Sequence, residues 1–325
     1  MKAAWYSNNG EAREVLMVGE LPTLVPAAGE VRVKLAVSGV NPSDVKSRRG
    51  RVLGSDRIVP HSDGAGTIDA VGPGVSTTRI GQRVWVWNGQ WQRPMGTACE
   101  SIVLPESQAV ALPENTDFAA GACMGIPGLT AFHAVSKLGD ISGKTVLVIG
   151  ASSAVGHYAV QMAVVGGARV IGTVGSVAKA EHAKAASVSE TIFYKTESVA
   201  ERVKALTNGR GVDAIIDMDF SSTAPLIAEG VLAPHGALVC YGSNVNGDTP
   251  VSFRPLLFNS LSLHFFLVYD LNPAERRSAL DGLTQLLLNK RLKHTIGARF
   301  SLDDIAAAHE AVEAGQLIGN VVLDI

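Results

Sequence analysis

The second half of the chain alternates short apolar runs with segments of helical periodicity. Val146–Ile149 predicts a buried strand, and small residues lead from it into a predicted helix over Val155–Val165. The same alternation predicts further strands at Ala168–Thr173, Thr191–Tyr194, Val212–Asp217, Ala237–Tyr241 and Leu261–Val268. It predicts further helices over Val177–Ala186, Ser198–Leu206 and Thr223–Val231. This order predicts a doubly wound α/β domain, in which helices cover both faces of a parallel sheet.

The first part of the chain has a different pattern, in which short strand-like runs are separated by turns rich in glycine and proline. These runs are Val31–Val37, Thr67–Val71, Val84–Trp87 and Ser101–Leu104. They predict an antiparallel, barrel-like domain. The tail predicts helices over Pro273–Asn289 and Ser301–Ala314 and a strand at Asn320–Asp324. We expect the tail to return to the β-rich domain, with the active site in a cleft between the two domains.

The segment T-V-L-V-I-G-A-S-S-A-V-G at 145–156 carries the first candidate chemistry. A strand that enters a helix through small residues binds anions, because backbone N–H groups and the helix dipole both favour negative charge. The dinucleotide fingerprint G-x-G-x-x-G is met here by Ala151, Ser153 and Gly156, so only one of its three glycines is present. The alternative interpretation is an ordinary turn between a strand and a helix.

Composition limits the possible partners. The chain has 325 residues, which suggests about two domains, and its net charge of −2 gives no electrostatic reason to expect nucleic acid or a membrane surface. The three cysteines are far apart, which fits a reducing compartment. The N-terminus has no apolar signal core, and no apolar run approaches the ~18 residues of a membrane helix. We therefore expect a cytoplasmic protein that acts on a small molecule.

Several ordered motifs carry a family resemblance. They include G-V-N-P-S-D at 39–44, P-H-S-D-G-A-G-T at 60–67, G-Q-R-V at 81–84, G-L-T-A at 128–131 and G-N-V-V-L at 319–323. On these motifs the chain resembles the medium-chain dehydrogenase/reductase superfamily, in its zinc-free quinone oxidoreductase (zeta-crystallin-like) branch. The resemblance implies a Rossmann coenzyme domain at 123–269. It also implies a β-rich GroES-like catalytic domain at 1–122 and 270–325.

The resemblance also suggests that no metal is used. Zinc-dependent relatives carry a Cys at the position of Asn41, a His-Glu pair at Ser62-Asp63, and a Cys or His close to Ile126. An amide, a hydroxyl and an alkyl group do not make a thiolate and imidazole zinc site. His61 and His133 fit structural roles better than ligand roles. We therefore expect a reaction that needs no Lewis acid, such as reduction of a quinone or an enone.

The expected cofactor is NADPH. An NAD site places an acid about 20 residues after the glycine loop, but no acid occurs between Arg169 and Lys179. Gly175 and Ser176 leave room for a 2′-phosphate, and Lys179 offers positive charge, although a solvated helix lysine is the alternative. The resemblance places Tyr194 against the same phosphate.

Other coenzyme contacts follow from the resemblance. It implies that Thr130 contacts the nicotinamide carboxamide, with backbone groups near Phe266 and Val268. Tyr241 and Ser243 follow a strand and are expected at its carboxyl end, where open α/β sheets bind ligands. The remaining candidates are Ser153, Ala154 and Val155 in the small-residue turn, and Asn320 in the last motif.

The catalytic candidates lie between residues 41 and 52, a segment that we expect to be a loop. The Asn41 amide could donate to a substrate carbonyl and stabilise developing charge, or it could cap its own turn. Lys46 is a candidate proton donor if it is desolvated, and a surface lysine otherwise. Members of this branch often carry a tyrosine here, but this chain has a basic cluster that could attract an acidic substrate. The cluster consists of Lys46, Arg48, Arg49 and Arg51.

The sequence thus predicts an NADPH-dependent, zinc-free oxidoreductase that transfers hydride to a quinone or an α,β-unsaturated carbonyl. Two alternatives stay open: an enoyl-thioester or alkenal reductase, and an NADPH-binding protein without turnover. Trp85, Trp87 and Trp91 are either walls for a planar substrate or core residues. The apolar segment 261–269, last in the predicted sheet, suggests a homodimer through that edge.

Overall fold

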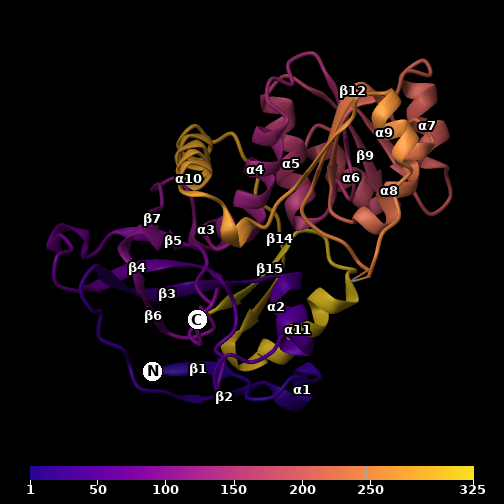
Figure 1. Ribbon diagram of the computed structural model, residues 1–325. Coiled ribbons are helices and arrows are strands. Elements are labelled where there is room, and N and C mark those ends of the chain that lie inside the picture. The colour runs from indigo at the N-terminus through magenta and orange to yellow at the C-terminus, as the bar shows by residue number, and fades with distance from the viewer. Residues whose placement is uncertain (246) are drawn as a thin grey trace. The chain divides into compact units, whose positions relative to one another are not determined.

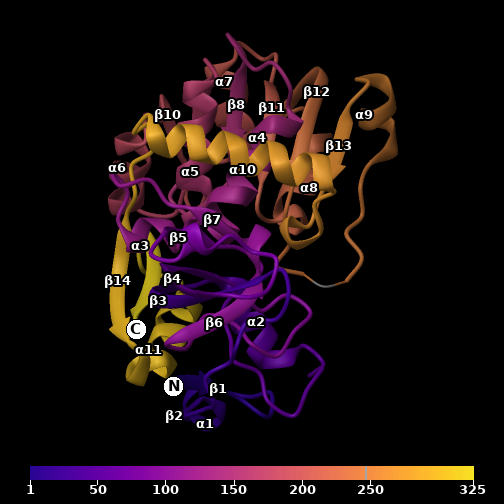
Figure 2. The same cartoon turned by 90° about the vertical axis from the view of Figure 1, so that its left-hand side faces the viewer.

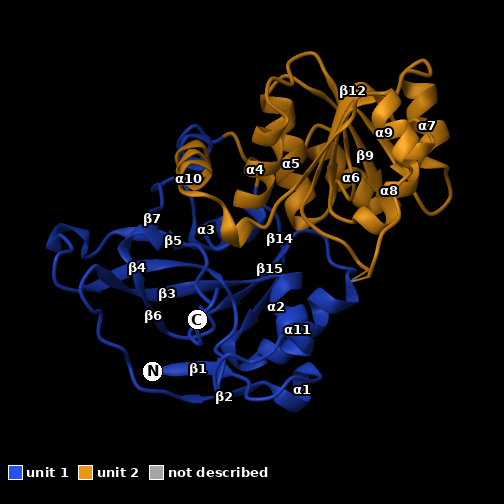
Figure 3. Ribbon diagram, viewed as in Figure 1, with its two compact units in different colours: residues 1–128, 283–290, 294–325 blue, residues 129–282, 291–293 orange. Residues whose placement is uncertain are grey.

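The computed structural model describes residues 1–245 and 247–325, and the chain forms two compact units (Figures 1 and 3). Unit 1 comprises residues 1–128, 283–290 and 294–325, and unit 2 comprises residues 129–282 and 291–293. None of the helices described is long and apolar enough to cross a membrane.

Unit 2 contains a six-stranded parallel sheet with the strand order β10-β9-β8-β11-β12-β13. This is the doubly wound order of dinucleotide-binding domains, so the predicted Rossmann fold is confirmed. The middle residues of the central strands are apolar because both faces of the sheet are covered: Leu147, Ile171 and Ile215 are fully buried. The strands are β8 (Thr145–Val148), β9 (Arg169–Val174), β10 (Glu190–Phe193), β11 (Val212–Asp217), β12 (Leu232–Cys240) and β13 (Ser262–Phe265).

The helices of unit 2 follow the predicted pattern with two additions, α4 and α9. The predicted helices are α5 (Ala154–Val165), α6 (Val177–Ala185), α7 (Val199–Leu206) and α8 (Phe220–Ala228). The additional ones are α4 (Leu129–Lys137), which contacts α5, and the short α9 (Phe253–Phe258) beside α8.

Unit 1 is built on a largely antiparallel sheet with the order β14-β15-β3-β4-β5-β7, in which β6 also pairs with β3. β15 (Asn320–Asp324) lies antiparallel to β3 (Glu30–Val40), so the tail completes the sheet begun by the first part of the chain. The other strands are β4 (Asp63–Val71), β5 (Arg83–Val86), β6 (Ser101–Pro105), β7 (Ala109–Ala111) and β14 (Ile296–Ser301). A separate ribbon joins β1 (Lys2–Trp5) and β2 (Met17–Glu20), and the helices are α1 (Ala12–Val15), α2 (Pro42–Gly50), α3 (Phe118–Gly121) and α11 (Ile305–Ala314).

The compact units divide the chain later than the expected boundaries at 122 and 270. The helix α10 (Pro273–Leu288) runs along α4 (Figure 2), and its first ten residues belong to unit 2. A Cβ on Gly282 would lie 2.0 Å from the Phe132 ring, and Lys137 pairs with Glu275 at 2.5 Å. This tight packing, which no local pattern signals, places the start of the tail in unit 2.

Candidate functional site

The turn between β8 and α5 has the features of an anion site. Ser153 is the N-cap of α5, and its hydroxyl accepts the backbone N–H of Gly156 at 3.0 Å. Ala154 and Val155 begin the helix, where backbone N–H groups have no intrahelical acceptor. The described geometry is therefore the one that binds a pyrophosphate in this fold.

The structure also explains how the turn works with a single fingerprint glycine. A Cβ on Gly156 would lie 2.2 Å from the carbonyl oxygen of Gly150, so the close approach of helix and strand requires glycine there. The methyl group of Ala151 lies against Gly172 of β9, where a Cβ would lie 2.6 Å from it. A glycine on the neighbouring strand thus makes the room that the fingerprint usually obtains from its first glycine.

The end of β9 offers room and a hydroxyl cap. Ser176 is the N-cap of α6, and its side chain accepts the backbone N–H of Lys179 at 3.3 Å. The Tyr194 ring is 53% exposed and stands over Gly175, where a Cβ would lie 2.9 Å from the Tyr194 hydroxyl. These four candidates therefore lie together, and a flat group such as an adenosine can approach the backbone at Gly175.

A second group of candidates surrounds Phe266 in unit 2. Its ring lies edge-on to His133 with 4.6 Å between centroids, and 6.2 Å from the Tyr241 ring. Thr130 precedes His133 by one turn on α4. The Thr130 and Tyr241 hydroxyls are buried, and neither has a hydrogen-bond partner among the described residues. An unpaired buried polar group costs about 1–3 kcal/mol, so these hydroxyls fit a site completed by a polar ligand.

Three other predicted coenzyme residues already make contacts inside their own units. The Val268 carbonyl accepts a hydrogen bond from Arg276 at 2.6 Å, and the Ser243 hydroxyl accepts the Val245 N–H at 3.2 Å. Asn320 belongs to unit 1, where its amide donates to the carbonyl of Thr295 at 3.3 Å. The structure therefore groups Thr130, Tyr241 and Phe266, and does not add Asn320 to them.

The segment after β3 is a helix, and the expected loop at 41–52 was wrong. Asn41 is the N-cap of α2, Pro42 is its first residue, and the Asp44 carboxyl accepts the Asn41 backbone N–H at 2.7 Å. The order Asn-Pro-x-Asp is itself a helix start signal. That signal was available in the sequence, but the helix has no apolar stripe to accompany it.

The Asn41 side chain joins a buried cluster with Asp63 and Ile126. Its amide nitrogen donates to Asp63 Oδ2 at 2.9 Å, and the backbone N–H of Ile126 donates to the same oxygen at 2.9 Å. Asn41 is only 4% exposed and Asp63 is fully buried. The Asn41 side chain also forms a hydrogen bond with the Asp44 carboxyl, so Asn41 contacts both buried acids. The structure thus brings together three segments that are far apart in the sequence.

Asp63 is the functional candidate that sequence reasoning missed. Burial raises its pKa well above the usual range, and the neighbouring Asp44 raises it further. Burial also raises the pKa of Asp44 to about 7. Asp63 Oδ1 has no hydrogen-bond partner among the described residues. Burial and Asp44 thus both disfavour the charged form of Asp63; its sequence signal was its place beside Ser62, where zinc-dependent relatives carry a His-Glu pair.

A chain of buried side chains supports the backbone of Asp63. Thr97 Oγ1 donates to the Asp63 carbonyl at 2.5 Å, and Ser38 Oγ lies 2.8 Å from Thr97 Oγ1 and 2.9 Å from His61 Nδ1. His61 Nε2 lies 2.9 Å from His309 Nε2. His61 has a positive φ of 75°, which is uncommon outside glycine.

The donor and the acceptor of each of these hydrogen bonds can be assigned from the Asp63 carbonyl, which can only accept. Thr97 gives its only hydroxyl proton to a carbonyl, so Ser38 must donate to Thr97 and accept from His61 Nδ1–H. A neutral His61 then has a bare Nε2, which accepts the Nε2–H of His309. Burial lowers the pKa of both imidazoles, that of His309 to about 3, in agreement with two neutral rings.

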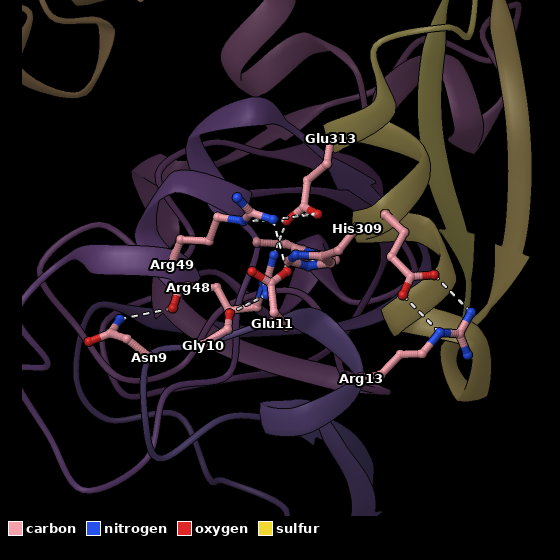
Figure 4. A network of polar contacts seen from close by, with 10 residues as sticks. Asn9, Gly10, Glu11, Arg13, Arg48, Arg49, His309 and Glu313 are labelled. Carbon is pink, nitrogen blue, oxygen red and sulfur yellow. Dashed lines mark hydrogen bonds and ion pairs between the residues drawn. The ribbon is translucent and has the colours of Figure 1, made fainter. Parts of the chain in front are cut away.

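The basic cluster is largely neutralised within unit 1 (Figure 4). Arg48 is fully buried, and its guanidinium donates to the Gly10 carbonyl and to the Glu313 carboxylate. Arg49 pairs with Glu11 at 2.9 Å and with Glu313 at 3.0 Å. These two arginines therefore do not attract an acidic substrate.

Lys46 and Arg51 remain exposed on and just after α2. The exposure of Lys46 favours a solvated lysine over a desolvated proton donor. Arg51 instead lies over the Trp91 ring, with 5.1 Å between the guanidinium carbon and the ring centroid.

A pocket of about 320 Å³ lies entirely within unit 1, between the end of α2 and the segment 90–94. Tyr6, Arg51 and Trp91 are among its lining residues. Burial, with a further contribution from Asp44, raises the pKa of Tyr6 to about 12, so its phenol stays protonated. Tyr6 therefore contributes a protonated phenol to the lining of this pocket. Trp85 is a fully buried core residue.

Among the described residues no group of three or more His, Cys, Asp or Glu side chains is placed to hold a metal ion. The side chains at the three positions that we compared with zinc relatives are the Asn41 amide, the Ser62 hydroxyl with the Asp63 carboxyl, and the Ile126 alkyl group. Such a set does not provide the thiolate and imidazole ligands of a zinc site.

Comparison with known proteins agrees with this architecture. Residues 27–114 match the family described as alcohol dehydrogenase GroES-like domain, and residues 154–285 match the zinc-binding dehydrogenase family. A quinone oxidoreductase of Pseudomonas aeruginosa is 32% identical over 318 residues, which cover 95% of each chain. A 2-haloacrylate reductase of a Burkholderia species is 29% identical, over 92% of this chain and 91% of its own length.

The fold extends the similarity to solved structures. The Escherichia coli quinone oxidoreductase complexed with NADPH superposes with a TM-score of 0.89 and 26% identity, and the match covers 100% of both chains. The identity to the Pseudomonas enzyme and the two family matches, one in each unit, leave no other assignment. The chain belongs to the medium-chain dehydrogenase/reductase superfamily, as a quinone oxidoreductase-like enzyme.

Proposed function

We propose that this protein is an NADPH-dependent, zinc-free oxidoreductase that reduces a quinone or an α,β-unsaturated carbonyl compound. The observation that carries the proposal is the buried contact between Asn41 and Asp63. An amide held by a buried carboxyl is a hydrogen-bond donor and does not ionise an alcohol as a metal ion does. The quinone oxidoreductases of Pseudomonas aeruginosa and Escherichia coli support the same reaction class.

The proposed roles follow from the contacts of each residue. NADPH, when bound, supplies a hydride to the acceptor. The Asn41 amide, which is positioned by the Asp63 and Asp44 carboxyls, donates to the acceptor oxygen, where negative charge develops. The acceptor gains the hydride and one proton from water, which is a balanced two-electron reduction. Lys46 is exposed, so we assign the proton to water.

The coenzyme assignment rests on the two groups of candidates in unit 2. The α5 N-terminus at Ser153 takes the pyrophosphate, and Ser176, Lys179 and Tyr194 surround the position of a 2′-phosphate. The unpaired Thr130 and Tyr241 hydroxyls suit the carboxamide of the nicotinamide, which both donates and accepts hydrogen bonds. The Escherichia coli and mycobacterial relatives whose structures are described as NADPH complexes support this choice.

Consumption of NADPH with a panel of acceptors tests the function. We expect turnover with simple quinones or enones, and no loss of activity after dialysis against a strong chelator. Activity with enoyl thioesters alone would favour the thioester reductase, and activity restored only by zinc would contradict the metal-free proposal. NADPH binding without turnover of any acceptor would favour a non-catalytic binding protein.

Replacing Lys179 tests the coenzyme. Lys179→Ala should weaken NADPH binding by about tenfold or more while NADH binding changes little, because only NADPH carries the 2′-phosphate. Lys184→Ala, in the same helix and paired with Glu181, is the matched control. An equal effect of Lys179→Ala on both coenzymes would contradict the assignment.

We also propose that the protein forms a homodimer in a reducing, cytoplasmic compartment. β13 is an edge strand of its sheet, and the large side chains on and near it are exposed: Phe253 71%, Phe258 72% and Phe265 58%. An apolar edge of this kind pairs with another chain unless it is covered. The three cysteines are buried free thiols. A monomer by sedimentation at micromolar concentration would contradict the dimer.

A further inference from the structure

The pocket in unit 1 has an uneven charge. Its lining includes Arg51 and Arg93 but no aspartate or glutamate. Arg93 donates to the Asn88 carbonyl at 3.0 Å and to the Gln108 amide oxygen, so its guanidinium is occupied by the protein. Arg51 is therefore the cation of this pocket that is open to a ligand.

The surroundings of Arg51 differ from those of the neighbouring arginines. Arg48 and Arg49 both pair with Glu313, whereas Arg51 forms no ion pair among the described residues and only influences Asp44 through its charge. Its guanidinium carbon lies 5.1 Å from the Trp91 ring centroid, and contact with an aromatic face restricts the motion of a guanidinium while its N–H groups can still donate. A guanidinium held in this way is preorganised to bind a planar anion through two parallel hydrogen bonds.

Tyr6 adds a neutral donor to the same pocket. Its backbone pairs with Ile58 through two hydrogen bonds of 2.9 Å, and its side chain is only 3% exposed. The same ring is close enough to Asp44 to be influenced by its charge, and Asp44 binds the Asn41 backbone N–H. Tyr6 thus lies between the pocket and the segment that carries Asn41.

We propose that this pocket selects acceptors that carry a carboxylate, with Arg51 pairing the carboxylate and the Tyr6 hydroxyl donating a further hydrogen bond. The substrate class is a small planar quinone or α,β-unsaturated carbonyl compound with an acidic group. This proposal deepens the proposed function and rests on it. The pocket volume of about 320 Å³ suits a small ligand, since ligand pockets start at about 300 Å³.

Direct binding tests the pocket without turnover. Isothermal titration calorimetry of the full chain would compare cinnamate with cinnamamide, which has the same shape without the charge. We expect cinnamate to bind at least about tenfold more tightly, and Arg51→Gln to remove that preference. Tyr6→Phe should weaken cinnamate binding severalfold. Equal binding of the two probes to the wild-type protein would overturn the proposal.

Arg57→Gln is the matched control. Arg57 stacks on Trp5 at the same 5.1 Å, but it lines a different pocket, which contains Asp56. Its replacement should leave the preference for cinnamate unchanged. A loss as large as that of Arg51→Gln would mean that general surface charge attracts the probe, which would also overturn the proposal.

Steady-state kinetics then separates this proposal from the proposed function. For a pair of enones that differ only in a carboxylate, we expect the ratio of kcat/KM values to favour the acid and to fall about tenfold in Arg51→Gln. If no acceptor is turned over while cinnamate binding still depends on Arg51, the proposed function fails and the anion pocket stands. If neutral and acidic enones react equally well, the function stands and the anion pocket fails.

Discussion

The coenzyme turn of unit 2 and the Asn41–Asp63 cluster of unit 1 are built in opposite ways. The turn is one continuous stretch, residues 150–156, that offers backbone groups and needs mainly small side chains. The cluster joins three distant segments through side-chain contacts, so each member is a partner for another. Outside the glycines that its close contacts require, a site of backbone groups should tolerate the loss of a side chain, whereas a site of paired buried groups should not.

The largest expected effect comes from removing Asp63. Asp63→Ala removes the acceptor of the Ile126 N–H and one acceptor of the Asn41 amide, so we expect the free energy of unfolding of unit 1 to fall by about 2–5 kcal/mol. All four tryptophans lie between residues 5 and 91, so tryptophan fluorescence during urea unfolding reports on unit 1.

Asp63→Asn is the control for this substitution. It keeps an acceptor oxygen of the same geometry, and burial already disfavours the charge that the substitution removes. Its loss of stability should therefore be much smaller. Equal stability of Asp63→Ala and the wild-type protein would show that the cluster contributes little.

The next effect concerns catalysis. Asn41→Ala should lower kcat by about 10–100-fold, because it removes a donor aimed at the developing charge, and leave the Kd of NADPH nearly constant. This loss is smaller than the one usually caused by removing such a donor, because water can partly replace the amide. An unchanged kcat would reduce Asn41 to a helix cap, and a large loss of NADPH affinity would make it a coenzyme ligand.

The buried histidine pair should make unit 1 sensitive to acid. The folded pKa values of His61 and His309 lie below 6.5, so the unfolded chain binds more protons as pH falls from 6.5 toward the folded values. The stability that the pair contributes is present above pH 6.5 and is lost below it, by up to about 1.4 kcal/mol per pH unit for each histidine.

His309→Gln isolates this contribution. The glutamine amide can still donate to His61 but does not titrate, so the pH dependence of stability below 6.5 should lose the contribution of one histidine. The raised pKa of Asp44 has the opposite effect on stability, because it favours the folded state at low pH. Asp44 is present in both the wild-type protein and the variant, so its effect cancels in the comparison. Parallel pH curves for the two proteins would refute the titration of His309.

The smallest effect is expected at the coenzyme turn. Ser153→Ala removes the cap of α5 and should lower the stability of unit 2 by about 1 kcal/mol, with less than a tenfold loss in NADPH affinity. Far-ultraviolet circular dichroism and coenzyme titration measure the two quantities. A loss as large as that of Asp63→Ala would remove the contrast between the two sites.

The same contrast explains what sequence reasoning could predict. The strand Val212–Asp217 and the helix over Val155–Val165 could be predicted because elements buried in a doubly covered sheet domain have apolar runs that are visible in the sequence. α2 was missed because its sequence is polar and only its cap signals it. The partners of Asp63 and His61 are set by the pairing of distant strands and helices, which no local pattern contains.

The edge strand and the domain boundary show the same limit. The predicted strand 261–268 is shorter in the structure, where β13 ends at Phe265 and a 3₁₀ turn follows at Val268–Asp270. The first part of α10 belongs to unit 2 because Phe132 packs on Gly282. Both outcomes depend on side-chain packing between elements rather than on periodicity.

The pairing of β15 with β3 has a consequence for biosynthesis. The sheet of unit 1 receives its strand β15 only after the whole of unit 2 has been translated, whereas the sheet of unit 2 comes from one continuous stretch of chain. On the ribosome, unit 2 can therefore fold while β3 still lacks this neighbour. A chaperone that binds exposed strand edges would therefore have the longest time to bind the first 128 residues.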